Sequence, residues 1–573
     1  MEGRLRYYVR ALLLLIMTAL AAGIVEWNDM GNAHAIVRNT ESEKSTDEQF
    51  ELTAWIDNTL CVKSWKNGTD GSYCLFLPGA VADRKLTLTF NGTENIFIDD
   101  KMIPNGSLHL LAEGRHSLWT GSGESDACNL DVWFTSDIAA LFLETESGSM
   151  DKIHASKEES ESGRMMIMDS RGHDYFEGDI EYIRCRGNSS YEDTDKKSYT
   201  LKLAKKADLF NMGEAKKWVL TANAFDDTLI RNAVAFSIAG GLGLAYTPDA
   251  QYVDVYENGR FLGNYLLSEK IEVGRNRVNI RDLEDEVEVL NGESGLEDME
   301  FFMEQQGRLF STKGYRIENE PQDISGGYLL ELETSDRYGL EASGFLTSRM
   351  QPVVFASPQY ASYDQVSYVS GLYQDFEDAV FSENGISPYT GKKYNEYIDM
   401  DSFARKYLLE ELVKNLDASF TSQYIYKYDD SISDKFYAGP CWDYDKSIAA
   451  SGITDDGIDL HDPDGLYAAV QEKDSDIWYA LYQHTDFRKE AAKIFYEELE
   501  PMLRESAPQM IYGYSSRIDA SNDCNMIRWN TFPQAEKIAE KRSLHDAKVE
   551  ELAEFIDKRL DYLGSEWGDL RDE

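Results

Sequence analysis

The sequence is short of positive charge. Lys and Arg number 57 against 103 Asp and Glu, which gives a net charge of −46 over 573 residues. A field of that sign repels nucleic acid and anionic lipid, so we expect neither as a general partner. It repels ATP as well, unless local basic residues and metal ions offset it. Hydrophobic residues still make up 42% of the chain and aromatic residues 12%, which excludes global disorder.

Cysteine is also scarce, and its six positions form no C-x-x-C pair, so no zinc site is expected. Cys61, Cys74 and Cys128 could supply one disulfide in an exported chain, although the sequence does not say which two would pair. Cys441 has no His near it in sequence, and we expect it to be a small buried hydrophobic residue and not a nucleophile.

Long apolar runs are absent except at the N-terminus. Three arginines precede an apolar run of 15 residues, Ala11–Val25, and Ala19-Leu20-Ala21 offers a small-x-small cleavage site. This pattern predicts a signal peptide or an uncleaved signal anchor over residues 1–25, followed by a polar linker over residues 26–50. We therefore expect an extracytoplasmic protein, either secreted or anchored in the cell envelope, whose N-terminal segment contacts the membrane.

Residues 50–135 alternate short apolar runs with turns, and Asn-Gly or Asp-Gly pairs recur among them. Regularly spaced strands with such turns predict a small antiparallel β-sandwich. This region shows no catalytic constellation, so a binding or spacer module is the natural interpretation.

The most informative stretch is NLDASFTSQYIYKYDDSISDKFYAGPCWDYDKS, residues 415–447. An apolar, helix-like segment leads into it, and two strand-like runs then flank a polar turn near Ile432. A hairpin brings its open ends together, so Asp417 before it and Asp443 after it are expected to converge. Carboxylates arranged in this way suit a hard cation such as Mg²⁺, which leaves positions open for phosphate oxygens. The alternative is a solvated hairpin whose acids face water.

Two upstream blocks accompany the hairpin: YIRCRGNSSYEDTDKKSYTLKL at 182–203 and WVLTANAFDDTLIRNAVAFSIAGGLGLAYTP at 218–248. Together with WDYDKS they resemble the spore coat protein H (CotH) kinase family of atypical, secretory-type kinases. The resemblance covers about residues 138–564, with an acidic insertion at about 281–325. It implies an α+β fold, a two-lobed atypical protein-kinase-like domain that follows the sandwich-like module.

The resemblance also implies which residues face the nucleotide. Arg186, Asn188 and Ser189 would approach the phosphates, and Lys202 looks like the phosphate-pairing lysine of kinases, with Lys197 as the fallback. Glu269 follows where an adenine-contacting hinge would lie, although a solvated acid at a strand end is the simpler reading.

The same comparison assigns the catalytic and metal-binding groups. Asp443 matches the metal-binding acid, and Asp445 is a second ligand. Gln423 stands where kinases often carry an Asn ligand. Asp417 matches the acid of the catalytic loop, which would orient the acceptor hydroxyl or accept its proton.

The resemblance thus implies an ATP-dependent kinase that uses Mg²⁺ or Mn²⁺ and phosphorylates Ser or Thr of a protein, such as a coat or cell-envelope protein. The sequence has no G-x-G-x-x-G loop and no typical kinase catalytic-loop tripeptide, so the family resemblance carries this inference. Two alternatives stay open: another nucleotide-using transferase on the same scaffold, and a non-catalytic exported surface protein that only binds a partner.

Overall fold

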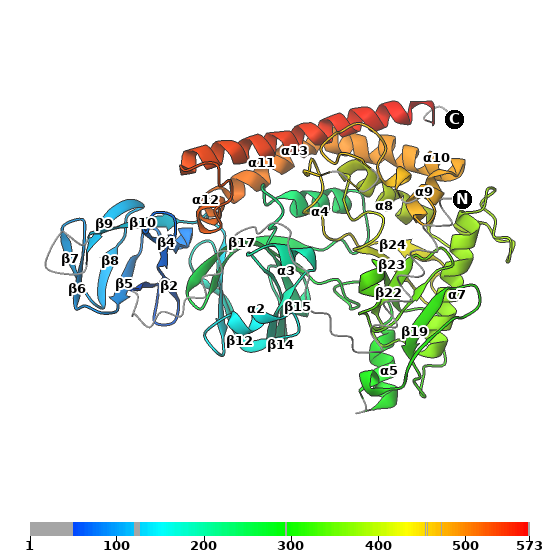
Figure 1. Ribbon diagram of the computed structural model, residues 1–573, viewed down its shortest axis with the longest axis horizontal. Coiled ribbons are helices and arrows are strands. Elements are labelled where there is room, and N and C mark those ends of the chain that lie inside the picture. The colour runs from blue at the N-terminus through cyan, green and yellow to red at the C-terminus, as the bar shows by residue number, and fades with distance from the viewer. Residues whose placement is uncertain are drawn as a thin grey trace, which may run out of the picture. The chain divides into compact units, whose positions relative to one another are not determined.

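The computed structural model describes residues 50–119, 127–292, 295–452, 454, 457–471 and 473–570 (Figure 1). The predicted signal segment, and all of the predicted linker except Phe50, lie outside these residues. Within the described part, no helix combines the length and apolar composition needed to cross a membrane.

The predicted all-β region is confirmed, and its strands lie between Leu52 and Phe134 in two sheets. The first sheet has the order β2 (Cys61–Lys63), β1 (Leu52–Trp55), β5 (Lys85–Phe90) and β8 (Ser107–Leu110). The second has the order β3 (Trp65–Lys66), β4 (Tyr73–Leu77), β10 (Cys128–Phe134), β9 (Gly114–Trp119), β6 (Asn95–Ile98) and β7 (Lys101–Pro104). The sandwich is not wholly antiparallel as predicted, because β10 pairs with β4 in parallel. These two strands are separated by a long stretch of chain, so no tight turn constrains their direction.

The sandwich shares its apolar core with the region that follows it. Phe142 and Phe261, which lie beyond the sandwich, belong to the same buried cluster as Leu75 and Val132. The rings of Phe76 and Phe261 lie 5.1 Å apart. The predicted division of the chain at about residue 135 stays a prediction, and separating the two regions there would expose the apolar surface that they share.

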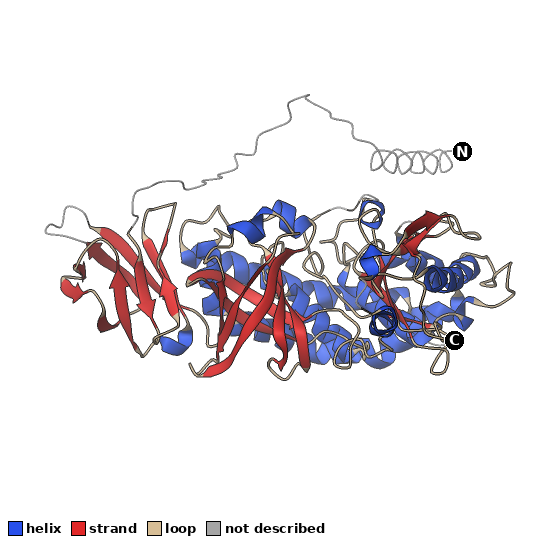
Figure 2. Cartoon of the chain, turned by 90° about the horizontal axis from the view of Figure 1, so that it is seen from below, coloured by secondary structure: helices blue, strands red, loops and turns tan. Residues whose placement is uncertain are grey.

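Seven strands after the sandwich close into a barrel, drawn in red in Figure 2. Their order is β11 (Ala139–Thr145), β12 (Glu161–Met168), β13 (Asp174–Arg186), β14 (Ser198–Asp208), β15 (Glu214–Thr221), β17 (Arg260–Glu269) and β16 (Ala250–Glu257). Closure comes from β11, which pairs in parallel with β16. The predicted Asn258-Gly259 hairpin joins β16 to β17, and both turn residues have positive φ, as a type I′ turn requires.

A buried helix, α4 (Arg231–Gly241), follows β15. Asp226 and Asp227 suit the N-cap and first turn of a helix, but the structure places the start of α4 after them, at Arg231. The Asp226 carboxylate instead accepts hydrogen bonds from the backbone N–H groups of Thr228 and Arg231, while Leu229 has a φ of 62°. A left-handed residue cannot continue a right-handed helix, so α4 starts after it.

A second seven-stranded sheet carries the central hairpin. Its order is β18 (Phe301–Glu304), β19 (Ser311–Tyr315), β21 (Gly344–Leu346), β22 (Pro352–Ser357), β20 (Tyr328–Leu332), β23 (Gln423–Lys427) and β24 (Phe436–Ala438). The acidic segment at 281–325 supplies α5 (Leu283–Asn291) and the two strands at one end of this sheet.

The remaining helices form most of the C-terminal part, which Figure 1 colours from green through yellow to red. They are α6 (Ser335–Tyr338), α7 (Tyr363–Val380), α8 (Met400–Val413), α9 (Ile477–Tyr482), α10 (Thr485–Ile494), α11 (Glu500–Arg517), α12 (Asp519–Arg528) and α13 (Ile538–Glu566), besides the short α2 (Asp151–Ala155) and α3 (Ser189–Asp193) in the barrel region. One large apolar cluster joins α4, α7, α8, α11 and α13 to the second sheet. The described fold is thus a mixed α+β structure with an all-β N-terminal region.

All six cysteines are described, and all are free thiols. A disulfide between two of Cys61, Cys74 and Cys128, which the sequence left open, is therefore not formed.

Candidate active site

The central hairpin forms as predicted. Strands β23 and β24 pair antiparallel, with Tyr426 opposite Tyr437. Helix α8 precedes the hairpin and stops at Lys414, whose φ is 45°. Asp417 therefore lies in the loop between α8 and β23, and Asp443 follows β24.

The two acids at the hairpin mouth converge, since the N–H of Leu416, next to Asp417, donates to the carbonyl of Lys446, next to Asp445, at 3.2 Å. Burial, and then the charge of Asp443, raise the pKa of Asp417 above its usual range. Burial raises the pKa of Asp443, although Arg186 and Lys446 oppose the change. Burial, and then the charges of Asp443, Asp226 and Asp417, raise the pKa of Asp445 well above its usual range. The hairpin thus brings together three carboxylates whose simultaneous ionisation is unfavourable.

The carboxylates of Asp443 and Asp445 form no hydrogen bond or salt bridge with the described residues. The described residues also contain no group of three or more His, Cys, Asp or Glu side chains arranged to hold a metal. Mg²⁺ does not require such a cage, since it binds through one or two carboxylates plus phosphate oxygens and water. Two carboxylates without other partners therefore fit Mg²⁺ or Mn²⁺ as the ligands of a nucleotide-bound ion.

Arg186 stands beside these acids. Its neighbour Cys185 lies in the barrel interior, so strand alternation turns Arg186 to the outer face. The guanidinium carbon lies 4.8 Å from the centre of the Trp442 ring. Burial lowers the pKa of Arg186, and the charge of Asp443 is the first to oppose that change. The guanidinium forms no hydrogen bond or salt bridge with the described residues, so its donors are open to a ligand such as phosphate.

A second cation, Lys446, was not assigned a role from the sequence. The charge of its ammonium lowers the pKa of all three acids, against the effect of burial. It also donates to the Ser189 hydroxyl at 3.3 Å and lies 4.1 Å from the centre of the Phe225 ring. The only signal in the sequence is that Lys446 directly follows the second acid of the WDYDKS motif.

Two residues of the predicted phosphate turn, Asn188 and Ser189, make different contacts. Ser189 reaches the acids through Lys446. The side-chain oxygen of Asn188 instead accepts a hydrogen bond of 3.1 Å from Lys157. Of the two, Ser189 is thus the one whose side chain contacts Lys446, the cation beside the acids.

Lys202 lies further along the barrel. On β13 and β14, Arg186 is opposite Ser198, whereas Lys202 is opposite Tyr182, four residues away or about 13 Å along the strand. The Lys202 ammonium pairs with Glu181 at 2.5 Å. A role for Lys202 with the phosphates stays a prediction, and the structure puts Arg186 and Lys446 nearer the acids.

The fallback lysine, Lys197, is engaged elsewhere. Its ammonium donates to the backbone carbonyls of Tyr191 and Thr194, which hold the turn between β13 and β14.

Glu269, at the end of β17, is not the solvated acid of the simpler reading. It pairs with Arg277 and accepts the Asp249 N–H at 3.0 Å. Burial raises the pKa of Glu269 to about 7. Its carboxylate is thus occupied by structural partners, while a hinge role stays a prediction.

Gln423 is buried, and neither atom of its amide has a hydrogen-bond partner among the described residues. Strand alternation puts it on the face of β23 that carries the core residue Ile425. Tyr424 points to the opposite face, where it bonds to Glu331 and interacts with Arg186. Metal ligation by Gln423 therefore gains no support from its direction.

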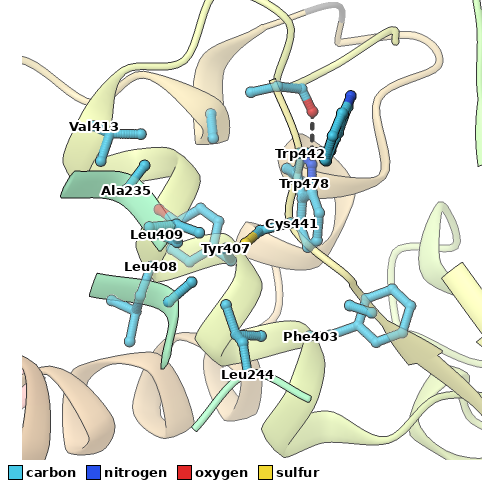
Figure 3. Close-up of a cluster of buried hydrophobic side chains, with 14 of the residues drawn as sticks. Ala235, Leu244, Phe403, Tyr407, Leu408, Leu409, Val413, Cys441, Trp442 and Trp478 are labelled. Carbon is cyan, nitrogen blue, oxygen red and sulfur yellow. Dashed lines mark hydrogen bonds between the residues drawn. The ribbon is translucent and has the colours of Figure 1, made fainter. Parts of the chain in front are cut away.

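The apolar cluster beside the hairpin fixes the backbone of both acids. Cys441 is fully buried in the same cluster as Tyr407, Trp442 and Trp478 (Figure 3). Its full burial agrees with the predicted packing role, and burial raises the pKa of its thiol to about 11. The indole N–H of Trp478 donates to the carbonyl of Ala418 at 2.9 Å, the dashed line in Figure 3, and so holds the loop next to Asp417.

A pocket of about 360 Å³ opens beside the acids. Leu416, Asp445 and Lys446 form one wall, and Phe225 with the start of α4 forms another. The pocket gives a second molecule an approach to the residue next to Asp417.

A family model supports the comparison made from the motifs. The model described as CotH kinase protein matches residues 183–563. The match begins in β13 and ends in α13, so it includes Arg186, Asp417 and Asp443 and excludes the sandwich. No curated protein matches the chain significantly.

Proposed function

This chain belongs to the CotH kinase family, and from that membership we propose that it is a two-lobed, kinase-like enzyme that transfers the terminal phosphoryl group of ATP to a Ser or Thr hydroxyl of a protein. The observation that supports this most is the meeting of Asp417, Asp443 and Asp445 with Arg186 and Lys446. Phosphoryl transfer needs cations on the phosphates, carboxylates for a metal ion, and a group that orients the acceptor.

In this proposal the barrel with α4 forms one lobe, and the second sheet with α7–α13 forms the other. Arg186 comes from the barrel, whereas Asp417 and Asp443 flank the hairpin of the second sheet. The nucleotide phosphates would thus be held between groups from both parts of the fold.

Arg186 and Lys446 are the residues proposed to bind phosphate. An open guanidinium suits bidentate contact with phosphate oxygens, and the flat face against Trp442 limits its rotation. Lys446 contributes a point charge between the acids and the Ser189 turn. Together they offset the repulsion that this acidic protein exerts on ATP.

Asp443 and Asp445 would hold a Mg²⁺ or Mn²⁺ ion. Such an ion neutralises charge on the phosphates and orients them for transfer.

Asp417 is proposed to orient the acceptor hydroxyl and to accept its proton. Its raised pKa, caused first by burial, moves the carboxylate towards the range in which a general base works well at neutral pH. The pocket lined by Leu416 offers the acceptor side chain a path to it.

We also propose that the protein is exported and acts on coat or cell-envelope proteins. The support is the basic-then-apolar N-terminal segment in the sequence and the family.

The test is incubation of the full chain with ATP and Mg²⁺ or Mn²⁺, with binding followed by calorimetry and products by mass analysis. We expect metal-dependent binding and a phosphate on the protein or on an added envelope protein. A nucleotidyl group instead would favour another transferase, and absence of nucleotide binding with either ion would favour a non-catalytic binding protein.

A further inference from the structure

The acid-bearing segment has a strained backbone. Asp443 has a φ of 65°, in the left-handed region that a residue with a side chain seldom adopts. Such a conformation persists only where the surrounding contacts hold it. The contacts that hold this residue therefore bear on the direction of its carboxylate.

The contact next to Asp443 comes from α4. The backbone N–H of Tyr444 donates to the side-chain oxygen of Asn232 at 2.7 Å. Asn232 is only 2% exposed, and its NH₂ group donates to the side-chain oxygen of Asn223 at 2.9 Å. With one end of the amide accepting and the other donating, its orientation is fixed.

The preceding residue of α4 makes a second contact four residues along the segment. The Arg231 side chain donates from Nε to the carbonyl of Ile448 at 3.1 Å. Asp226 and Asp227 both pair with this guanidinium and keep it in place. Helix α4 thus forms hydrogen bonds with the segment at residues 444 and 448, on either side of Asp445 and Lys446.

A purely structural role would predict that these bonds only satisfy buried backbone groups. The location favours a further role in positioning the acids, because Asn232 contacts Tyr444, the single residue between the two proposed metal ligands. It also follows directly after the strained residue. Without the Asn232 side-chain oxygen, the backbone at Tyr444, which carries Asp443 on one side and Asp445 on the other, would lose its hydrogen-bond acceptor.

We infer that Asn232 is a positioning residue that fixes Asp443 and Asp445 in the geometry that binds the metal-bound nucleotide. The inference rests on the proposed function.

The experiment compares three variants of the full chain. Asn232→Leu has similar volume and no acceptor, so it leaves the Tyr444 N–H without its partner. Asn232→Asp keeps an acceptor at the same position. Asn223→Ala is the matched control, since it removes the other partner of Asn232 and leaves the contact with Tyr444. The readouts are the Mg²⁺ dependence of ATP binding by calorimetry, the split between kcat and KM, and the melting temperature.

We expect Asn232→Leu to raise the Mg²⁺ concentration for half-maximal ATP binding by about tenfold or more and to lower kcat, in line with the loss of supporting residues at metal sites. Asn232→Asp should retain more of both, and Asn223→Ala should stay within about threefold of the wild type. If Asn232→Leu does not fold, Asn232→Ser takes its place, because its shorter side chain cannot reach the Tyr444 N–H. Wild-type Mg²⁺ dependence in the Leu or Ser variant would overturn the inference and leave the proposed function intact. Equal shifts in that variant and in Asn223→Ala would overturn it as well. A wild type that binds no ATP would overturn the proposed function first, and the inference with it.

Discussion

Replacing the two acids at the hairpin mouth separates metal binding from proton transfer. Asp443→Asn and Asp417→Asn are nearly isosteric, so both variants should fold. If Asp443 holds the metal and Asp417 orients the acceptor, the two substitutions should fail in different ways. Asp434→Asn, on an exposed turn residue of the same hairpin, controls for a simple loss of negative charge.

The charges of the site set the expected magnitudes. When ionised, three carboxylates and two cations leave one net negative charge, and Asp443→Asn removes it. ATP binding without metal should therefore strengthen, while the gain on adding Mg²⁺ should fall by about tenfold or more, equivalent to about 1.4 kcal/mol. Asp417→Asn should leave ATP and Mg²⁺ binding nearly unchanged and lower kcat by about 10²-fold or more, the scale of a lost general base.

The assay is calorimetric ATP titration with and without Mg²⁺, alongside single-turnover transfer measured by mass analysis. Melting curves check that each variant folds. The assignment of roles is refuted if both variants keep wild-type transfer, or if Asp417→Asn loses Mg²⁺-dependent binding as strongly as Asp443→Asn. A control that behaves like either variant would show that the effects come from net charge alone.

Three further predictions follow from the packing. Arg186→Ala should weaken ATP binding more than Lys202→Ala, because Arg186 lies beside Asp443 while Lys202 is paired with Glu181; calorimetry showing the reverse order would restore Lys202 as the main phosphate contact. Burial raises the pKa of Glu377 from 4.5 to about 7, so the stability associated with its neutral form is fully present below about pH 4.5 and is lost as pH rises to about 7. Glu377→Gln should then stabilise the protein by up to about 3 kcal/mol at pH 8 and by almost nothing at pH 4, and urea unfolding with equal shifts at both pH values would contradict this. Gly263→Ala should lower the free energy of unfolding by about 2 kcal/mol or more, since φ is 124° there and an added Cβ would lie 2.6 Å from the Asn525 side chain; an unchanged urea midpoint would show that α12 can shift without cost.

Local patterns in the sequence predicted the helix and the strands around the site. The apolar period over residues 403–416 and the polar turn between two aromatic runs predicted α8 and the β23–β24 hairpin, and both formed. The hairpin geometry also predicted that Asp417 and Asp443 converge, because an antiparallel pair brings its two open ends together. Asn258-Gly259 similarly identified the turn between β16 and β17.

Sequence patterns said less about the contacts of individual lysines. The resemblance put Lys202 first and Lys197 second as the phosphate-pairing lysine; in the folded barrel Lys202 pairs with Glu181 and Lys197 holds a turn, and a phosphate role for Lys202 stays a prediction. No local pattern distinguishes such a lysine from Lys446, whose contact with Ser189 spans 257 residues.

The sequence by itself therefore determined the hairpin, the helix before it and the gathering of acids, since these depend on periodicity and turn chemistry over a few residues. Only the tertiary structure decided which cations stand beside the acids and which helix holds them. Closure of the barrel turns Arg186 towards Trp442, and the packing of α4 brings Asn232 to the backbone of Tyr444, 212 residues away. Contacts of that kind follow from how whole elements pack, which neighbouring residues in the chain do not encode.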